Sequence, residues 1–327
     1  MVPSNYIGSS RKFASFRPAE LNYNTVNMDP ATHILTGTLL SKCFPKRKAS
    51  LATLVFAANA PDLDYITYLW GADVFLRYHR GFTHGIFSLV LFSLLTGLLM
   101  HMVFKRGFAY FALISSAGYA SHICLDLMNR YPVRLFSPLD WSKYYLDVLF
   151  VIDPYVTGAL LIGVILAVRR ENLKRLVVAV TVLFVSLYIC GRFYLKGLAE
   201  DFLRTRLDEY SYHLFPLPND FLRWWFVTES AGTYKVGTVD LFTRRVSVDE
   251  RFVYSEDEPE IAESKQLRTV RNFLYFARLP LPEIERNGEE TVVTWHDLTY
   301  SSLPGEHFIA RVRFDRLGRA VKEYIKF

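Results

Sequence analysis

The 327-residue sequence has few cysteines and lacks the short motifs that mark many soluble hydrolases. Its three cysteines, Cys43, Cys124 and Cys190, form no C-x-x-C pair and no disulfide framework. The sequence contains no H-E-x-x-H motif, no G-x-S-x-G elbow and no P-loop, and no G-x-G-x-x-G follows a predicted strand. The signatures of zincin peptidases, α/β-hydrolases and nucleotide-binding folds are therefore absent.

Acidic residues are scarce in the first 199 residues, which hold ten Asp and Glu against 20 Lys and Arg. The last 128 residues hold 22 acids and 18 bases, so the net charge changes from +10 to −4 near Glu200. This change predicts a domain boundary, with one domain over residues 28–199 and a second over residues 200–327. Because the basic excess belongs to an apolar first domain, we expect no nucleic-acid partner.

Residues 1–27 lack the apolar core of a signal peptide. They are rich in Ser, Asn, Tyr, Phe and Arg and predict a disordered N-terminal extension. The helical pattern begins directly after Met28, which leaves Met28 open as an alternative translation start.

Charged residues are also absent from residues 85–104, a run of twenty that is long enough to cross a bilayer. Further long apolar helices are predicted over residues 108–127, 148–168 and 176–195. Two helices over residues 31–44 and 49–60 are too short to cross the hydrocarbon fully. The first domain is therefore predicted to be an α-helical membrane domain with four long spans and two short N-terminal helices.

The second domain has a different pattern. Residues 232–242, 245–254, 291–300, 308–314 and 320–327 are rich in Val, Thr, Tyr and Phe and partly alternate, as strands do. Residues 266–277 favour a helix. We expect a small soluble β-rich domain outside the membrane.

Basic residues gather in three places, residues 42–48, 105–106 and 169–175, which together hold ten Lys and Arg and one acid, Glu171. Cytoplasmic loops carry such an excess. We therefore expect an integral membrane protein whose basic loops face the cytoplasm and whose C-terminal domain lies on the extracytoplasmic side. Seven of the ten acids among the first 199 residues lie between Asp62 and Asp153, in segments that this topology also places outside.

The same outer segments carry a set of histidines and aspartates. The candidate metal ligands are His33, Asp62, Asp64, His79, His84, His122 and Asp126. His122 and Asp126 are four residues apart on a predicted helix, so both side chains project from one face. Ionisable groups are costly at membrane depth, and imidazoles with carboxylates suit a divalent cation. These residues therefore predict a metal site, with zinc as the expected ion and room for more than one.

Several roles at this site stay open in the sequence. His79 and His84 are either both ligands or one ligand and one proton carrier, and Asp64 with His84 are the candidates for a direct catalytic role. Asp147 and Asp153 could each orient a ligand histidine, although Asp153 before Pro154 also fits a helix cap. Three arginines near the site, which could hold a substrate phosphate through bidentate contacts, are Arg80, Arg130 and Arg134.

Five motifs in order carry a family resemblance: Asp29-Pro30-x-Thr32-His33, Pro61-Asp62-x-Asp64, His79-Arg80-Gly81-x-Thr83-His84, His122-x-x-x-Asp126, and the segment from Asp147 to Pro154. Residues 28–200 resemble the YdjM/YfhP-type family of membrane-bound metal-dependent hydrolases. That resemblance implies an inner-membrane location and hydrolase activity. It also implies a distant similarity to zinc-dependent phospholipase C and the S1/P1 nucleases, whose clustered zinc ions are bound by His and Asp.

These patterns together predict metal-assisted hydrolysis of a phosphoester at the outer face of the membrane. The substrate would be a small molecule or a lipid headgroup, and the lipid bilayer itself is the expected partner. The rival hypothesis is a non-catalytic membrane protein in which the His and Asp cluster binds a structural or regulatory metal. A coordination position left open to water would favour the hydrolase, and a site closed by protein ligands would favour the rival.

Overall fold

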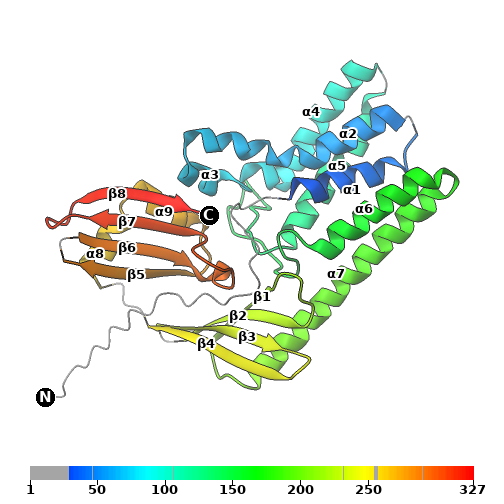
Figure 1. Ribbon diagram of the computed structural model, residues 1–327. Helices are drawn as coiled ribbons and strands as arrows, with labels where there is room; N and C mark the ends of the chain where they lie inside the picture. The colour runs from blue at the N-terminus through cyan, green and yellow to red at the C-terminus, as the bar shows by residue number, and fades with distance from the viewer. Residues whose placement is uncertain (1–28, 46, 106, 231, 254–256, 289) are drawn as a thin grey trace, which may run out of the picture.

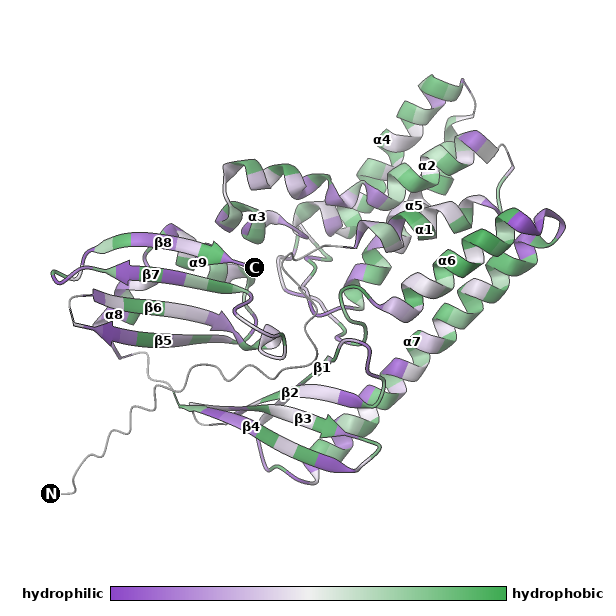
Figure 2. Ribbon diagram, in the orientation of Figure 1, coloured by the Kyte–Doolittle hydropathy of each residue, from purple (hydrophilic) through white to green (hydrophobic). Residues whose placement is uncertain are grey.

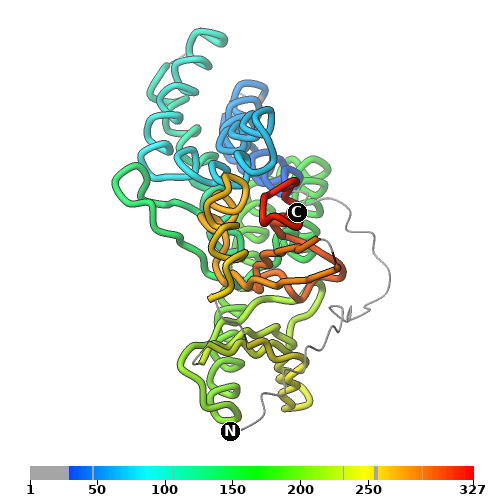
Figure 3. Tube along the Cα trace, turned by 90° about the vertical axis from the view of Figure 1, so that its left-hand side faces the viewer, coloured from blue at the N-terminus to red at the C-terminus, as the bar shows by residue number. Residues whose placement is uncertain are grey.

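A computed structural model describes residues 29–327, apart from residues 46, 106, 231, 254–256 and 289. The predicted disordered extension over residues 1–27 lies outside this described part of the chain. Figure 1 shows helices at one end of the molecule and two β-sheets at the other. In Figure 3 the blue and cyan helices lie at the top of the view and the yellow strands of the first sheet at the bottom.

The helical part contains both long and short elements. They are α1 (Pro30–Ser41), α2 (Arg47–Asn59), the 3-10 helix η1 (Pro61–Trp70), α3 (Ala72–Tyr78), the 3-10 turn η2 (Phe82–His84), α4 (Ile86–Phe104), α5 (Phe108–Leu127), α6 (Pro154–Arg169), the 3-10 turn η3 (Glu171–Leu173) and α7 (Lys174–Arg204). The predicted helices over residues 31–44 and 49–60 correspond to α1 and α2.

Two helices begin at the same kind of sequence signal. Asp29 caps α1 by accepting a hydrogen bond from the Thr32 amide at 2.8 Å, and Pro30 follows at the first helical position. Asp153 caps α6 in the same way by accepting from the amides of Tyr155 and Val156, with Pro154 after it. An aspartate satisfies the free amides of the first turn, and proline has no amide to satisfy there.

Within the described residues, three helices are long and apolar enough to cross a membrane: α4, α5 and the segment Glu171–Arg204 that contains α7. The fourth predicted span is shorter than expected, because α6 has only 16 residues. Residues 148–153 are not helical, and the amides of Val148 and Leu149 both donate to the carbonyl of Met128. The prediction of four full-length spans is therefore not confirmed. Figure 2 shows hydrophobic residues along the surfaces of these helices.

Small residues allow close contacts between α1, α2 and α5. A Cβ placed on Gly37 of α1 would lie 2.7 Å from the carbonyl oxygen of Leu54. A Cβ placed on Gly118 of α5 would lie 3.0 Å from the same oxygen and 3.1 Å from Ala57 Cβ. Such approaches are typical of helices that pack in lipid. They fix α2 between α1 and α5, and this arrangement positions the segment that follows α2.

The C-terminal part forms two four-stranded antiparallel sheets, each with its strands in sequence order. The first sheet contains β1 (Ser211–Pro216), β2 (Arg223–Ser230), β3 (Thr233–Asp240) and β4 (Arg245–Val253). The helices α8 (Pro259–Ser264) and α9 (Arg268–Phe276) come next. The second sheet contains β5 (Pro280–Asn287), β6 (Glu290–Asp297), β7 (Ile309–Phe314) and β8 (Ala320–Lys326). A β-rich region is thus confirmed, and the sequence missed β1, β2 and β5.

The sheets are joined to the helical part by buried contacts. Ala199 and Leu203, in the last turns of α7, share a core with Trp224 and Phe226 of β2. On the other side, Arg278 forms a bidentate pair with Asp147, with Nη–Oδ distances of 2.6 and 2.8 Å. The helix α7 therefore runs without a break across the predicted boundary at residue 200 and packs against the first sheet.

The packing at Gly37 gives a stability prediction. Gly37→Ala should lower the melting temperature of the detergent-solubilised protein, because the new methyl group meets the α2 backbone and overpacking costs about 1–3 kcal/mol. Gly158→Ala in α6 is the control, since a Cβ there would meet nothing within 4 Å. It should be neutral or stabilise the helix by about 0.5–1 kcal/mol. Equal melting temperatures for the two variants would contradict the close contact.

Candidate metal centre

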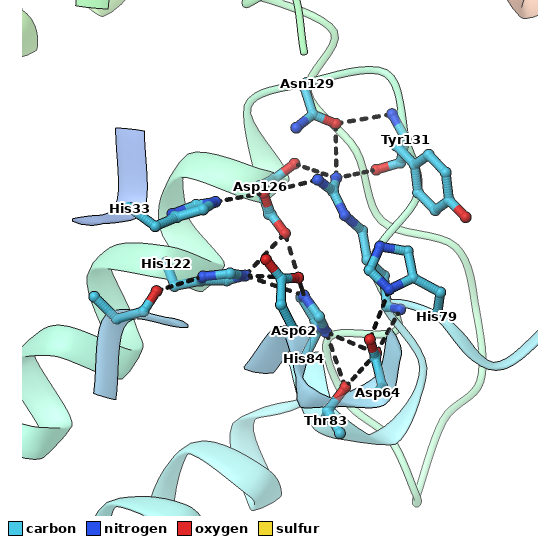
Figure 4. Close-up of polar contacts among 12 residues, drawn as sticks. His33, Asp62, Asp64, His79, Thr83, His84, His122, Asp126, Asn129 and Tyr131 are labelled. Atoms are coloured by element: carbon cyan, nitrogen blue, oxygen red, sulfur yellow. Dashed lines mark hydrogen bonds and ion pairs between the residues drawn. The ribbon is translucent and has the colours of Figure 1, made fainter. Parts of the chain in front are cut away.

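Four side chains from three separate segments meet at one end of the helices. They are Asp62, His84, His122 and Asp126, and each offers one donor atom such that all four atoms lie within 4.8 Å of one another. Three of these side chains are buried, and the Asp62 side chain is 14% exposed. Figure 4 shows them pointing toward a common centre, with His33 and His79 on either side.

Local structure explains why these segments meet. His122 and Asp126 lie one turn apart near the end of α5, on its buried face. Pro61 ends α2 and starts η1, which turns Asp62 and Asp64 back toward α5. Gly81 precedes the short turn η2, which holds the buried His84 directly before α4. Because α2, α4 and α5 pack against one another, all three segments reach the same end of the helices.

Five of the six distances among the four donor atoms are close to those of a tetrahedral metal site. His84 Nε2 lies 3.2 Å from both Asp126 Oδ2 and His122 Nε2, and His122 Nε2 lies 3.3 Å from Asp126 Oδ2. Asp62 Oδ1 lies 3.5 and 3.6 Å from the two imidazole nitrogens. A regular tetrahedron around zinc with bonds of about 2.05 Å has edges of about 3.3 Å. These five spacings therefore suit zinc ligands.

The protein also fixes which imidazole nitrogens face the centre. The Nδ1 of His122 lies 2.7 Å from the carbonyl oxygen of Ala58, and a carbonyl can only accept a proton. The Nδ1 of His84 lies 3.0 Å from Thr83 Oγ1, whose own proton goes to Asp64 Oδ2 at 2.7 Å. Nδ1 is then the donor in both rings, which leaves the Nε2 lone pairs to face the centre. Ligand histidines in metal sites are commonly oriented in this way.

A buried oxygen without a hydrogen bond supports the same interpretation. Among the described residues, no donor with hydrogen-bond geometry reaches Asp126 Oδ2. Its neighbours at 3.2 and 3.3 Å are the Nε2 atoms of His84 and His122. A buried carboxylate oxygen without a partner is costly. Two imidazole lone pairs and a bare carboxylate oxygen fit a divalent cation, so this donor set suits the expected metal.

A second group of donors adjoins the first. It consists of Asp62, Asp64 and His79, whose donor atoms also lie within 4.8 Å of one another, so Asp62 belongs to both groups. His79 Nδ1 lies 2.7 Å from Asp64 Oδ1, and Asp64 Oδ2 accepts from the Arg80 amide at 3.1 Å. Thr83 donates to Asp64 Oδ2 as well, and these contacts hold Asp64 against the loop over residues 79–84. Its predicted catalytic role stays a prediction.

The charges of the cluster shift the pKa values of its members. Burial by itself raises the pKa of Asp62, but the neighbouring imidazoles of His122 and His84 outweigh it and hold the pKa well below its usual value. Burial likewise opposes ionisation of Asp64, and the neighbouring His79 and His84 lower its pKa. Burial disfavours a charged His84, yet the nearby carboxylates of Asp126, Asp62 and Asp64 raise its pKa well above the ordinary value. The cluster thus favours carboxylates that are ionised and matched by positive charge.

Arg80 supports the cluster from behind. Its Nη2 donates to Asp126 Oδ1 at 2.8 Å, and its Nη1 donates to Asn129 Oδ1 at 2.8 Å and to the Tyr131 carbonyl at 3.2 Å. The Arg80 backbone has φ of 55°, which is uncommon for a residue other than glycine. This turn directs the Arg80 amide toward Asp64 and its side chain toward Asp126. Arg80 is 2% exposed, so it holds a ligand carboxylate instead of presenting a surface for a phosphate.

The other two arginines predicted to bind phosphate face the C-terminal sheets. Arg130 is fully buried and donates to the carbonyls of Thr299, at 3.0 Å, and Pro216. Arg134 donates to the carbonyl of Tyr275 at 3.0 Å. Carbonyl groups of the protein occupy these guanidinium edges, so the predicted phosphate contacts of Arg130 and Arg134 are not supported.

The remaining predicted residues lie around the cluster. The ring of His33 stacks on His122 with centroids 3.7 Å apart, and its Nε2 lies 3.4 Å from Asp126 Oδ1, so His33 is beside the four-atom group and not within it. Asp153 caps α6 and, with His33 and Asp126, lines a small pocket. Asp147 is paired with Arg278. In the part of the chain that the structure describes, neither Asp147 nor Asp153 hydrogen-bonds to a ligand histidine, and for Asp153 the alternative role of helix cap is the one observed.

Sequence reasoning missed several residues that position the site. Thr83 bridges Asp64 and His84, and Tyr119 donates to the Thr83 carbonyl at 2.5 Å. Asn129 accepts from Arg80 and from the Tyr131 amide at 2.9 Å. Thr83 lies inside a motif that the sequence had already singled out. Tyr119 and Asn129 carried no signal, because their role depends on tertiary contacts.

The family described as YdjM inner membrane protein matches residues 28–199. An uncharacterized protein named YfhP from Bacillus subtilis (strain 168) is 23% identical over 312 residues, which cover 87% of this chain and 90% of that protein. No solved structure matches the chain.

The contacts of Arg80 predict an effect on metal binding. Arg80→Gln removes the guanidinium that holds Asp126 Oδ1, and loss of such a supporting contact weakens metal affinity about 10–100-fold. Competition with a chromophoric zinc chelator in detergent measures this affinity. Arg77→Gln is the matched control, since Arg77 donates to Asn272 on α9 and not to the cluster. Unchanged affinity in Arg80→Gln would show that Asp126 needs no such support.

Proposed function

Because the chain belongs to the YdjM family of inner membrane proteins, we propose that it is a membrane-bound, metal-dependent hydrolase of phosphoester bonds. One observation carries the proposal. Two overlapping donor groups share Asp62, and in one of them five of the six donor distances are 3.2–3.6 Å, close to the edges of a zinc tetrahedron. A carboxylate common to both donor groups could bridge a pair of neighbouring divalent ions, such as those of two-metal hydrolytic sites.

The two groups differ in how many donors they supply. The group of Asp62, His84, His122 and Asp126 offers four protein atoms, which is the number in closed structural zinc sites. The group of Asp62, Asp64 and His79 offers three, which is the number in catalytic zinc sites that keep one position for water or substrate. We therefore assign the reacting side of the centre to Asp62, Asp64 and His79.

The chemistry follows from the groups around that side. Bound zinc would lower the pKa of a water molecule to about 7 and polarise a phosphoryl oxygen. Asp64 fixes the ring of His79 through the 2.7 Å contact. Thr83 and the Arg80 amide in turn hold Asp64. His84 lies between the two groups, since its Nε2 faces Asp62 and Asp126 and its Nδ1 lies 3.5 Å from Asp64 Oδ2. With Nε2 facing the four-donor group, His84 keeps its proton on Nδ1, toward Thr83 and beside the reacting side.

The closed four-donor group also supports the second candidate, a non-catalytic protein with a structural metal. A closed site needs no water and no substrate. The two candidates make different predictions for the three-donor group, because only the hydrolase requires it. His79→Ala should therefore abolish turnover while leaving zinc in the four-donor group, whereas a purely structural centre shows no turnover in either protein.

A metal and activity measurement tests the proposal directly. We expect about two zinc ions per chain in the reconstituted wild type, and zinc-dependent release of product from a chromogenic phosphodiester. Asp62→Asn should lose most of the zinc from both groups and at least about tenfold in activity. His101→Ala, which changes a histidine on α4 outside both groups, is the control. A zinc-loaded wild type that hydrolyses no phosphoester would overturn the hydrolase assignment.

The orientation in the membrane is also a proposal. His84 lies directly before α4 and Asp126 near the end of α5, and the basic Lys105 follows the opposite end of α4. The cluster and this basic turn therefore lie at opposite ends of the helix pair. With basic segments in the cytoplasm, the cluster and the C-terminal sheets lie outside.

Reporter fusions test this orientation. A fusion after Lys105 should be active with a cytoplasmic reporter, and a fusion after Phe327 should be active only with a periplasmic or extracellular reporter. Removing the positive charge at residues 169–175 is expected to weaken the preference. The same side for both fusions would rule out the arrangement.

A further inference from the structure

We infer that the apolar edge of η1 and the loop over residues 136–141 lie in the headgroup region of the bilayer, so that the metal centre sits at the depth of lipid phosphates. This inference rests on the proposed hydrolase function. The position of the centre then indicates the substrate class, a phosphoester of a membrane lipid, which reaches the centre without leaving the bilayer.

The short helix η1 has two unlike faces. Its inward face carries Asp62 and Asp64, whose side chains are 14% and 6% exposed. Its outward side chains are apolar or aromatic, and the most exposed of them are Leu63, Ile66, Tyr68, Leu69 and Trp70. Leu69 is 80% exposed and Trp70 is 62% exposed. One short element therefore carries metal donors on one side and a row of exposed apolar groups on the other.

A second exposed apolar group lies on the loop after α5. Leu139 is 95% exposed, and Phe136 and Trp141 are also exposed. This loop packs against the start of α4, because the Ile86 amide donates to the Leu135 carbonyl at 2.8 Å. Ile86 and Phe87 on α4 are exposed as well. The apolar loop is thus continuous with a helix surface that faces lipid in a membrane protein.

The composition of the η1 edge indicates lipid as the partner. Residues 65–71 contain no Lys, Arg, Asp or Glu, and they contain two tyrosines and a tryptophan. Tyr and Trp concentrate at the boundary between water and hydrocarbon, where one part of the ring is apolar and another can hydrogen-bond. Segments of this kind lie in the plane of the interface. Contiguous exposed apolar surface on a water-soluble face would be unusual.

The helix ends place the centre at the same depth. Asp126 is one residue from the end of α5 at Leu127, and His122 is five residues from it. At about 1.5 Å per residue, these donors lie within about 8 Å of the helix end. Interfacial segments bury their apolar faces about 5–10 Å into the boundary of headgroups and acyl chains. The phosphates of lipids in that leaflet are therefore level with the cluster.

Tryptophan fluorescence tests the position without any need for activity. The full chain in nanodiscs has five tryptophans, and Trp224, Trp225 and Trp295 are buried in the sheets. Lipids with a quencher near the headgroup should quench fluorescence more than lipids with a quencher at the acyl-chain end. Trp70→Phe combined with Trp141→Phe should remove most of this quenching. No quenching by either lipid would overturn the inference, as would coverage of this surface by a protein partner.

Hydrolysis of two substrates tests the substrate class. Leu69→Glu combined with Leu139→Glu should lower hydrolysis of phospholipid in the nanodisc by roughly tenfold, because charge draws the edges out of the interface. The same variant should hydrolyse a water-soluble phosphodiester as the wild type does. Leu317→Glu, which adds charge at an exposed leucine in the C-terminal sheet region, is the control. Equal loss on both substrates would overturn the lipid assignment.

The two failures can be told apart. If the zinc-loaded wild type hydrolyses neither substrate, the proposed function fails, and the quenching result still decides where η1 and the loop lie. If the wild type hydrolyses the soluble substrate but not the bilayer phospholipid, the hydrolase survives and the lipid substrate class is wrong.

Discussion

The carboxylate of Asp126 is the group on which the rest of the centre depends. One oxygen accepts from Arg80 and lies near His33, and the other faces His84 and His122. A charge buried this deeply is stable only if its surroundings compensate it on every side. The guanidinium of Arg80 compensates one oxygen. The second oxygen, Oδ2, faces a position where a cation could also bind the two imidazoles. One oxygen of Asp126 thus serves structural support and the other serves metal binding.

The support for Asp126 also connects the centre to the sheets. Asn129 and Tyr131 hold Arg80, and between them Arg130 donates to carbonyls of the C-terminal part. A few residues further on, Arg134 donates to Tyr275. The loop after α5 therefore holds the metal centre with one set of side chains and the sheets with the next. The C-terminal part therefore helps to support the metal centre. Its carbonyl groups at Thr299 and Tyr275 accept hydrogen bonds from Arg130 and Arg134.

Sequence reasoning identified the donors but not their supports. The spacing of His122 and Asp126 on a helix follows from the chain alone, and so does the turn at Pro61 that carries Asp62. The contacts of Arg80, Arg130 and Arg134 do not follow, because an arginine near a metal motif has the same sequence signal whether it binds a phosphate or a carbonyl 169 residues away. The strands β1 and β5 were missed because Pro216 ends the first and Pro280 and Pro282 begin the second, and β2 was missed because its apolar residues form a continuous run instead of alternating. The span at α6 was overestimated because apolar residues 148–152 pack irregularly beside α5.

The length of α7 has a mechanical consequence. Its 31 residues extend about 46 Å, and the hydrocarbon core of a bilayer is about 30 Å thick. The last turns pack against the first sheet through Ala199 and Leu203. A helix that is anchored in lipid therefore fixes the distance between this sheet and the bilayer. A thicker membrane shortens the part of α7 that extends beyond the bilayer, and a thinner membrane lengthens it. The loop after α5 also contacts both the sheets and the metal centre. A change in bilayer thickness that moves the sheets would therefore strain that loop.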